Sequence, residues 1–475
     1  MSKVKFSKSR KSAHLSPPPF FKGEGQGGGG QIPVDNLSSP HLASPLSRGE
    51  GSRWRGARKI KNPLIAKRKA APLLARRKRR ENRFRFYGIL AIAFAFGFLG
   101  ILLCNIISSG YSAFAETRIR LPITFSAGMT EDYFGAVRES LKNHFPEVHG
   151  KPELFRLYAL ISRDAEMQLK DMLAANPGLL GKTEEVWLKA SSDADMYFKG
   201  RITKNTAEAY RKLSDHQLDW LEFLASEKRM KKTFNSTFFS AGDSREPERA
   251  GILSSMAGSL LTILCCMLTA FPLGVMTAVY LEEFAAKNWI TAILEVNINN
   301  LAAVPSIIFG LLGLAVYIGF FGLPRSSSLV GGLTLALLIL PIIVIATRNS
   351  LRSIPPSIKD AAIALGASKM QSVLHHSIPL AMPGIITGTI LGIARAMGET
   401  APLLMIGMVA FIADVPRNIL SPATALPVQI FLWSDSPEAG FAERTSAAIM
   451  MLILFLAIIN GAAIFLRKKF EVKWS

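Results

Sequence analysis

Long apolar runs separated by short polar segments dominate the chain from residue 86 onward. Six of these runs are long enough to cross the roughly 30 Å hydrocarbon core of a bilayer as helices. They lie near residues 86–108, 251–280, 297–320, 329–348, 384–412 and 446–466. The third run follows a mixed stretch, "NWITAILEVNINN" (288–300), in which Trp289 and Ile293 share one side and Glu295 interrupts the apolar pattern. We expect this stretch to lie along the membrane interface.

A polar segment, residues 109–250, separates the first apolar run from the second. Stretches such as "PELFRLYALISRDAEMQLKDMLAA" and "NTAEAYRKLSDHQLDWLEFLASEKRM" carry apolar residues at helical spacing and few helix breakers. The segment contains no Cys, so it must fold without disulfides. The pattern predicts a mainly α soluble domain outside the membrane.

The positive charge of the chain is concentrated ahead of the first apolar run. Residues 1–85 hold 22 Lys and Arg against 4 Asp and Glu, which accounts for +18 of the net +21. This stretch is also rich in Pro and Gly, so we expect a basic, disordered cytoplasmic tail. No aromatic-interleaved basic fold accompanies it, which argues against nucleic-acid binding. Because no Met follows Met1 until Met129, a translated upstream region is an open alternative for the tail.

The Lys and Arg residues of the short loops predict the orientation of the spans. With the basic tail inside, nine of these residues fall on the inner side and three on the outer side. The inner ones are Lys287, Arg348, Arg352, Lys359, Lys369, Arg467, Lys468, Lys469 and Lys473, and the outer ones are Arg325, Arg417 and Arg444. This bias predicts a multi-pass protein with both termini in the cytoplasm.

A polar segment, "DAAIALGASKMQSVLHHSIPLAMPG" (360–384), then faces the cytoplasm between two apolar runs. It contains two capping-box patterns, each of which predicts the start of a short helix. The pairs are Ser357 with Asp360 and Ser368 with Gln371. We expect the first helix to end at Gly366, which tolerates left-handed backbone, and the second at Pro379, which lacks an N–H.

These two short helices carry an apolar patch that no core of the chain obviously covers. Its members are Ile358, Ala361, Ala362, Leu365, Met370, Val373 and Leu374. The residues alone leave two interpretations open: a loop resting on lipid headgroups, or a plug that fits a groove on a cytoplasmic partner.

One arginine lies deep in an apolar run. In "IARAMGET", Arg395 precedes Glu399 by one helical turn, and counting from Gly384 places Arg395 about 16 Å into the span. A membrane arginine is costly unless it is paired or faces water. The pair therefore either locks helices together or forms a site that lets an oxyanion pass without holding it too tightly.

Several separated motifs resemble known permeases. The pattern "DAA…G…IPLAMPG" resembles the EAA loop of ABC-importer permeases, although His376 stands where an aliphatic residue is usual. The stretches 251–285, 300–314, 394–407 and 424–431 resemble the A-subunit permease of the phosphate-specific (Pst) transporter family. The resemblance covers residues 250–475 and implies an all-α membrane protein with six transmembrane helices. It implies a type-I (MetI-like) permease core at 251–475 with an EAA coupling loop at 355–383. The remainder resembles a first span (86–108) and an extra domain (109–250) carried by some proteobacterial members.

The resemblance also implies a function and functional residues. It implies a permease subunit of an ATP-driven phosphate importer in the bacterial inner membrane, with ATP hydrolysed by a partner chain. On this reading the chain is not an enzyme and needs no catalytic residue, metal or cofactor of its own. The residues implied to couple to the ATPase are Asp360, Ala361, Ala362, Gly366, Met370 and Pro379. Those implied for the substrate pathway are Arg395, Glu399 and Arg348, the last being the nearest match to a family arginine that lies one turn earlier.

The implied protein partners are a second permease subunit (PstC-like), a dimer of ATP-binding subunits (PstB-like) and a periplasmic phosphate-binding protein (PstS-like). The implied substrate is phosphate. Membrane lipid is expected around the spans, and no nucleic acid is expected as a partner. Two other functions stay open: a permease for sulfate or molybdate, and a membrane sensor that uses residues 109–250 as its receptor domain.

The stretch "NPGLLGKT" (176–183) imitates a P-loop, but Asn176 occupies the first Gly position and no strand is predicted before it. His144 and His149, separated by Pro146, do not predict a metal site.

Overall fold

The computed structural model describes residues 63–126, 132–204, 208, 211–409 and 411–470. Contacts divide the chain into two units, residues 1–84 and 85–475. The described residues of the first unit, 63–84, are all helical and begin helix α1 (Pro63–Gly110), which continues into the second unit. Of the tail predicted to be disordered, residues 1–62 lie outside the described residues, and the prediction is wrong for residues 63–85, which are helical.

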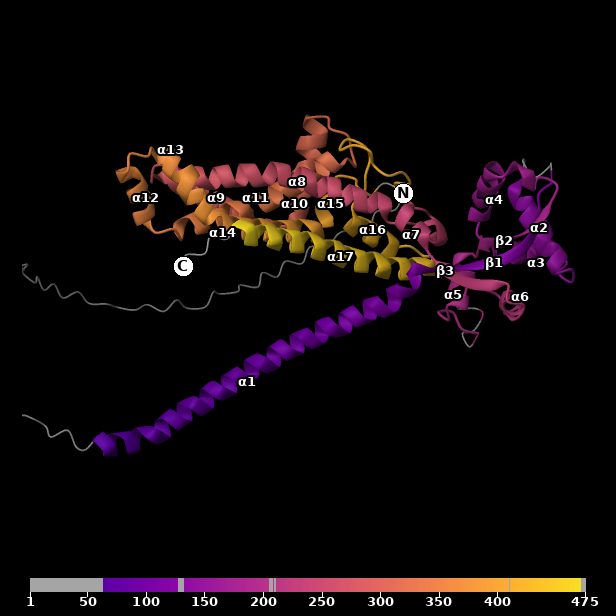
Figure 1. Ribbon diagram of the computed structural model, residues 1–475, viewed down its shortest axis with the longest axis horizontal. Coiled ribbons are helices and arrows are strands. Elements are labelled where there is room, and N and C mark those ends of the chain that lie inside the picture. The colour runs from indigo at the N-terminus through magenta and orange to yellow at the C-terminus, as the bar shows by residue number, and fades with distance from the viewer. Residues whose placement is uncertain (1–62, 127–131, 205–207, 209–210, 410, 471–475) are drawn as a thin grey trace, which may run out of the picture. The chain divides into compact units, whose positions relative to one another are not determined.

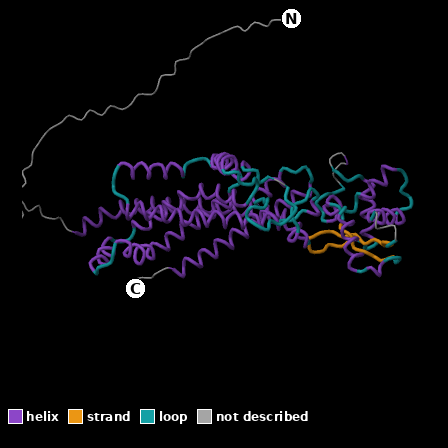
Figure 2. Tube along the Cα trace, turned by 90° about the horizontal axis from the view of Figure 1, so that it is seen from above, coloured by secondary structure: helices purple, strands orange, loops and turns teal. Residues whose placement is uncertain are grey.

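The insert after α1 combines helices with a three-stranded antiparallel sheet (Figure 2). Its elements are β1 (Ala115–Thr124), α2 (Tyr133–His144), α3 (Lys151–Tyr158), α4 (Asp164–Ala175), β2 (Thr183–Lys189), α5 (Ser192–Phe198), α6 (Asp215–Ser226) and β3 (Met230–Phe234). The strand order is β2-β1-β3, and Ile119 of β1 pairs with Leu188 on one side and Met230 on the other. The mainly helical character is confirmed, whereas the sheet was not predicted.

The sheet forms because β1 alternates apolar and polar residues with a period of two. Ile119, Leu121 and Ile123 point to one face, where they are fully buried in the core of the insert with residues of α2 and α6. Arg118 and Arg120 alternate with them and keep partial exposure on the other face. The apolar face of β1 thus organises the core against which the helices of the insert pack.

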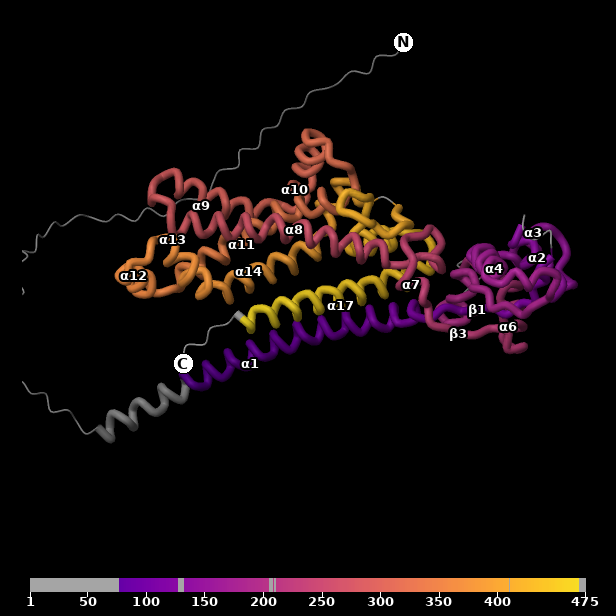
Figure 3. Tube along the Cα trace, turned by 45° about the horizontal axis from the view of Figure 1, so that its top comes forward, coloured from indigo at the N-terminus to yellow at the C-terminus, as the bar shows by residue number. Residues whose placement is uncertain are grey.

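The rest of the second unit is helical. Its helices are α7 (Ser236–Ser240), α8 (Leu253–Val279), α9 (Trp289–Leu301), α10 (Ser306–Gly313), α11 (Ser328–Arg352), α12 (Pro356–Ala364), α13 (Lys369–Ser372), α14 (Ile378–Gly398), α15 (Ala401–Met405), α16 (Leu426–Ser434) and α17 (Ala439–Phe470). Figures 1 and 3 show α8, α11 and α14 side by side. The central helix, α11, is apolar almost all round and mostly buried, as expected of a helix enclosed by others.

The described residues contain five helices that are long and apolar enough to cross a membrane, and a sixth if one bent pair counts as a span. The bent pair corrects the predicted span at 297–320. Helix α9 stops at Leu301, Pro305 precedes α10, and the two helices meet at 103°. Proline cannot donate the hydrogen bond that a continuous helix requires there. The stretch expected along the membrane interface is accordingly a helix of its own.

The fifth span also ends earlier in the sequence than predicted. Helix α14 ends at Gly398 instead of running on to residue 412, and Glu399 follows in extended backbone. Pro402 sits at the start of the short helix α15, where a missing N–H costs nothing. The proline therefore begins a new helix here and does not interrupt an existing one.

The insert contacts the end of α1 and the helices α16 and α17 through polar and apolar contacts. Lys199, the residue that follows α5, binds Glu443 of α17 at 2.9 Å. Arg201 donates to the carbonyl oxygens of Ser108 and Ser109 at the end of α1. An apolar cluster fills the space between these contacts; it includes Ala113, Phe238, Ile252, Trp433, Phe441 and Ala447. The insert is therefore packed against α16 and α17 through its own buried interface.

One contact of this junction gives a pH-dependent prediction. Asp243, in the loop before α8, accepts hydrogen bonds at 2.9 Å from the Trp433 indole and from the Ser244 backbone. Burial raises the pKa of Asp243, and the bond from Trp433 offsets part of that rise. The Asp243 carboxyl group therefore binds its proton more tightly in the folded protein than in the unfolded chain. Above the raised pKa the ionised carboxylate destabilises the folded state. This destabilisation disappears as the pH falls below the pKa that Asp243 has in the unfolded chain.

We expect Asp243→Asn to raise the melting temperature at pH 7 by up to about 3 °C, because the amide oxygen still accepts from Trp433. The gain over the parent protein should shrink as the pH falls toward 4. Thermal unfolding in detergent between pH 4 and 8 measures it. A variant that is less stable than the parent at pH 7 would show that the carboxylate charge itself stabilises the junction.

Candidate functional site

Arg395 and Glu399 lie at the C-terminal end of α14 and form an ion pair. The guanidinium Nε is 3.6 Å from a Glu399 carboxylate oxygen. Arg395 occupies the last turn of the helix, and Glu399 is the residue that follows it in extended backbone. The predicted pair is thus present, although its acidic member lies just outside the helix.

Close contacts between α11 and α14 fix the level at which Arg395 lies. A side chain at Gly384 would collide with Ser350, and one at Gly388 with Ala346. Farther along α14, a side chain at Gly392 would begin 3.6 Å from Ile339 and 3.8 Å from Ile343. Arg395, about one turn beyond Gly392, is then level with the part of α11 (Ser328–Arg352) that precedes Ile339, away from both ends of that helix.

Arg395 points away from the helices of its own chain. Its side chain is 41% exposed, whereas Glu399 is 20% exposed. The neighbouring Leu391 is also exposed on α14, while Gly392 and Ala396 are buried. Arg395 therefore lies on an open face of the single chain, in the last turn of α14 and alongside a part of α11 that is away from both ends of that helix.

Arg348, near the C-terminal end of α11, is enclosed by carboxylates. It is only 8% exposed, and it binds Glu295 of α9 at 2.5 Å and Glu282 at 3.3 Å. Arg352 also binds Glu282, at 2.9 Å. Through these two ion pairs Glu282 ties the end of α8 to α11. Glu295 was noted in the sequence as an interruption of α9, and its role as a partner of Arg348 was missed.

The 355–383 loop forms the predicted pair of short helices, with one correction at its start. Gly366 has φ +91°, and Ser368 caps α13 in a full capping box with Gln371. The box predicted at Ser357 is absent, because Pro355 is the N-cap of α12 and Ser357 falls inside its first turn. Proline at the first helical position already supplies the required φ, which moves the helix start upstream.

The second helix of the loop does not end at Pro379. A π-helical turn (Val373–Ser377) follows α13 and leads directly into α14, so residues 369–398 form one continuous rod. The Ile378 N–H bonds to the Val373 carbonyl, five residues back, where an α-helix would reach four. This local widening accommodates Pro379 near the start of α14, whose missing N–H breaks no regular α-helical bond.

The loop exposes a set of large apolar side chains. Leu365 is 90% exposed, and Ile363, Met370 and Leu374 are about half exposed. Asp360, Ala361, Gly366 and Pro379 are exposed as well, whereas Ala362 and Val373 are buried against the chain itself. The expected apolar patch is therefore present with a different membership, and none of the described residues covers it.

Charged contacts hold the loop against the end of α8. Lys359 of α12 forms an ion pair with Glu283, and the Lys369 ammonium lies 5.3 Å from the ring of Phe284. Both partners belong to the π-helical turn (Tyr280–Phe284) that ends α8. The loop is thus connected to α8, α11 and α14 together.

Neither the P-loop imitation nor a metal site gains support. The "NPGLLGKT" stretch follows helix α4 and precedes strand β2, the reverse of the strand–loop–helix order of a P-loop. His144 binds Glu227 at 2.9 Å. Over the residues that the structure describes, no group of three or more His, Cys, Asp or Glu could hold a metal ion.

Two families match separate parts of the chain. Residues 270–472 match the family described as binding-protein-dependent transport system inner membrane component. Residues 72–208 match a domain of unknown function, DUF3333. The first match runs from within α8 to the end of α17, and the second covers part of α1 and much of the insert.

The permease part is similar to bacterial phosphate permeases. The phosphate transport system permease protein PstA of Yersinia pestis is 34% identical over 223 residues, which cover 46% of this chain and 74% of that protein. PstA 1 of Mycobacterium tuberculosis (strain CDC 1551 / Oshkosh) is 36% identical over 219 residues, 46% of this chain and 70% of that protein. Among solved structures, a chain of the inward-facing MetNI methionine ABC transporter is 17% identical, with a TM-score of 0.38. The match covers 47% of this chain and 95% of that chain. The relatives confirm the family expected from the motifs: the chain belongs to the PstA family of phosphate transport system permease proteins.

Proposed function

We propose that this chain forms one half of a phosphate pathway across the bacterial inner membrane and that the 355–383 loop receives mechanical work from an ATPase subunit. Membership in the PstA family supports a phosphate permease over a sulfate or molybdate permease or a membrane sensor. As a permease subunit the chain is not itself the ATPase, so ATP is hydrolysed by a partner.

The exposed Arg395 is the observation that carries the proposal. An arginine on a lipid-facing surface at the level of mid-helix would cost several kcal/mol. Its open face must therefore meet either water or another protein. Both are provided if a second, PstC-like permease closes a water-filled pathway along this side of α14.

The pairing of Arg395 with Glu399 suits conduction. A lone arginine in a dry pathway would hold an oxyanion tightly, whereas a pathway needs attraction combined with weak binding. The long separation of 3.6 Å leaves the guanidinium able to bind another oxygen ligand. Arg348 repeats this balance at the inner end of α11 with two carboxylates, and we propose it as the inner member of the pathway.

We propose that the 355–383 loop docks in a groove of the ATPase subunit. The exposed apolar side chains support a partner, because patches of this kind mark interaction sites. The residues proposed for coupling are Asp360, Ala361, Ala362, Gly366, Met370 and Pro379. Ala362 is buried, so its part is to pack the loop, while the others line or shape the exposed surface.

The complete importer on this proposal contains three further kinds of chain. These are the PstC-like permease, a PstB-like ATPase dimer and a PstS-like phosphate-binding protein in the periplasm. The loop and both termini then lie in the cytoplasm, and the insert lies in the periplasm. Closure of the ATPase dimer would draw the two permease loops together and rock the helices between inward-open and outward-open forms.

Replacing Arg395 tests the pathway. We expect Arg395→Gln to lower phosphate uptake at least about tenfold, since a charge-assisted contact to an anion contributes roughly 1.5–3 kcal/mol and 1.4 kcal/mol corresponds to tenfold. Uptake of labelled phosphate into cells that express the whole importer measures the effect. Co-purification of the partner chains from mild detergent shows that assembly is intact.

Arg417→Gln is the matched control, because Arg417 is exposed in the segment between α15 and α16. It should transport as the parent does. Equal uptake by the Arg395 and Arg417 variants would contradict the proposed pathway. Competition by sulfate or molybdate as strong as that by unlabelled phosphate would contradict the proposed substrate.

A further inference from the structure

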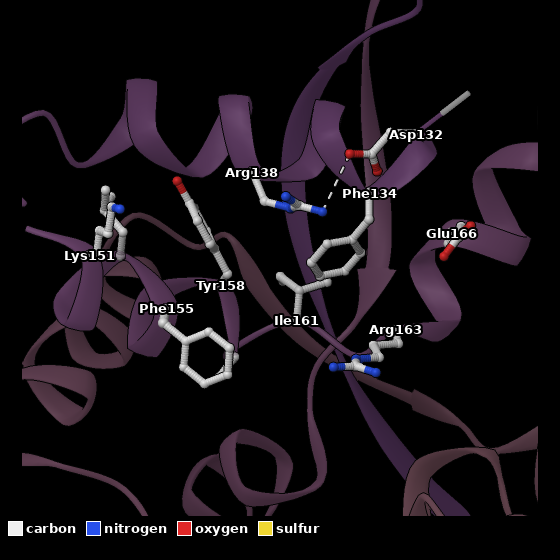
Figure 4. Close-up of a pocket in the computed structure, with 11 residues that line it drawn as sticks. Asp132, Phe134, Arg138, Lys151, Phe155, Tyr158, Ile161, Arg163 and Glu166 are labelled. Atoms are coloured by element: carbon white, nitrogen blue, oxygen red, sulfur yellow. Dashed lines mark hydrogen bonds and ion pairs between the residues drawn. The ribbon is translucent and has the colours of Figure 1, made fainter. Parts of the chain in front are cut away.

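The insert contains a cavity of about 630 Å³ that belongs to none of the parts discussed so far (Figure 4). It is formed by α2, by α3 and the loop after it, and by the beginning of α4. Its volume falls within the range of about 300–1,000 Å³ that is usual for small-molecule sites. The cavity is thus of a size to enclose an organic ligand.

Aromatic and aliphatic side chains form the apolar part of the wall. Ile161 is 3% exposed and lies beside the ring of Phe134, and Tyr158 stands on the side of α3 (Figure 4). Phe134 and Tyr158 pack against the core of the insert, so their positions are fixed from behind. Phe155, in contrast, is 72% exposed. A phenylalanine left in water at the mouth of a cavity gains free energy when an apolar group covers it.

Charged side chains stand around this apolar wall. Arg138 is engaged already, since it binds Asp132 at 3.4 Å and its guanidinium lies 5.6 Å from the centre of the Phe134 ring. Lys151 and Arg163 also line the cavity, and neither forms an ion pair with a described residue. With Glu166 as the second acid, three cations face two carboxylates, which leaves one net positive charge.

We propose that this cavity binds a small amphipathic organic anion, a carboxylate or phosphate ester with an aromatic or alkyl body. The body would lie on Phe134, Phe155 and Ile161, and the anionic group would be held by Lys151 or Arg163. Inorganic phosphate is a poor fit, because it has no apolar surface to cover Phe155. The proposal does not depend on the phosphate pathway.

Binding of two simple probes to the full-length protein in lipid nanodiscs tests the proposal. The probes are 2-naphthoate and decanoate, and empty nanodiscs correct for partition into lipid. We expect saturable binding of at least one probe with one site per chain. Naphthalene-2-carboxamide, the neutral analogue, should bind more weakly than 2-naphthoate, and inorganic phosphate should displace neither probe.

Variants locate the site. Phe155→Ala should weaken probe binding at least about tenfold, because covering a phenylalanine contributes about 1.5–3 kcal/mol. The double variant Lys151→Gln/Arg163→Gln should weaken binding of the anion and leave binding of the carboxamide unchanged. Leu180→Ala and Lys170→Gln change exposed residues of the insert outside the cavity and should bind as the parent does.

All the substituted side chains are exposed, so the variants should fold. The absence of saturable binding by both probes would overturn the proposal. So would unchanged binding by the Phe155 variant, or displacement of a probe by inorganic phosphate. None of these outcomes bears on phosphate uptake, so failure here is distinguishable from failure of the transport function.

Discussion

Replacing Gly366 by proline should abolish phosphate uptake while the chain still inserts in the membrane. Gly366 joins α12 to α13 with φ +91°, a value that proline, fixed near −65°, cannot adopt. No heavy atom of the rest of the chain lies within 4 Å of the position where a side chain would begin. The substitution therefore acts through the backbone alone, by changing the angle between the two short helices that carry the exposed apolar patch.

Gly366→Asn provides the matched control, because asparagine tolerates left-handed backbone better than other side chains do. It should retain most of the uptake, and Gly366→Ala should fall between the two. Uptake is measured with labelled phosphate, and the amount of protein in isolated membranes reports insertion. Parental uptake by the proline variant would show that the shape of the loop does not matter for transport.

Replacing Lys199 by methionine should destabilise the folded protein by about 3–5 kcal/mol, the usual cost of removing one partner from a buried ion pair. Lys199 is 4% exposed and binds Asp195 at 2.6 Å as well as Glu443 of α17 at 2.9 Å. Without the ammonium, the carboxylates of Asp195 and Glu443 would both lose an ion-pair partner in a poorly hydrated interface. Denaturant unfolding in detergent, followed by the fluorescence of the nearby Trp433, measures the loss.

Lys204 offers a control of the same residue type in the same domain. It pairs with Asp219 at 2.8 Å, but both side chains are about half exposed. Water solvates the carboxylate when the cation is removed, so Lys204→Met should change the stability little. Equal losses from the two substitutions would show that the junction between insert and α17 is not closed to water.

The family and the loop geometry could be predicted from sequence because they depend on local signals. Gly366, and Ser368 with Gln371, specify their backbone conformations within a few residues, and the structure has them as predicted. The contact between Arg395 and Glu399 is likewise local, since the two residues are four apart.

The partners of Arg348 could not be predicted in this way. Glu282 and Glu295 are 66 and 53 residues away in the chain, and only the packing of α8 and α9 against α11 brings them close. The buried junction is a similar case, with Lys199 and Glu443 separated by 244 residues. Single-sequence patterns describe local structure and carry no information on which distant segments meet.

The sheet of the insert was missed although a signal was present. Ile119, Leu121 and Ile123 alternate with polar or proline residues, which is the strand period, but the long helical stretches that follow dominate the composition of the segment. The rule that proline ends a helix failed at Pro379 for a different reason. The π-helical turn before it had already changed the hydrogen-bond register, and no residue type marks such a turn reliably.

The π-helical turn (Val373–Ser377) has a further consequence for the importer. Each residue of an α-helix advances the chain by about 100° around the axis, so one residue gained or lost in this turn would swing the 355–383 loop by that amount about the axis of α14. The loop would keep its shape and α14 would keep its length, but the apolar patch would face a different side of the α14 axis. The direction in which the patch faces is thus set by the five residues of the turn, separately from the shape of the loop that carries the patch.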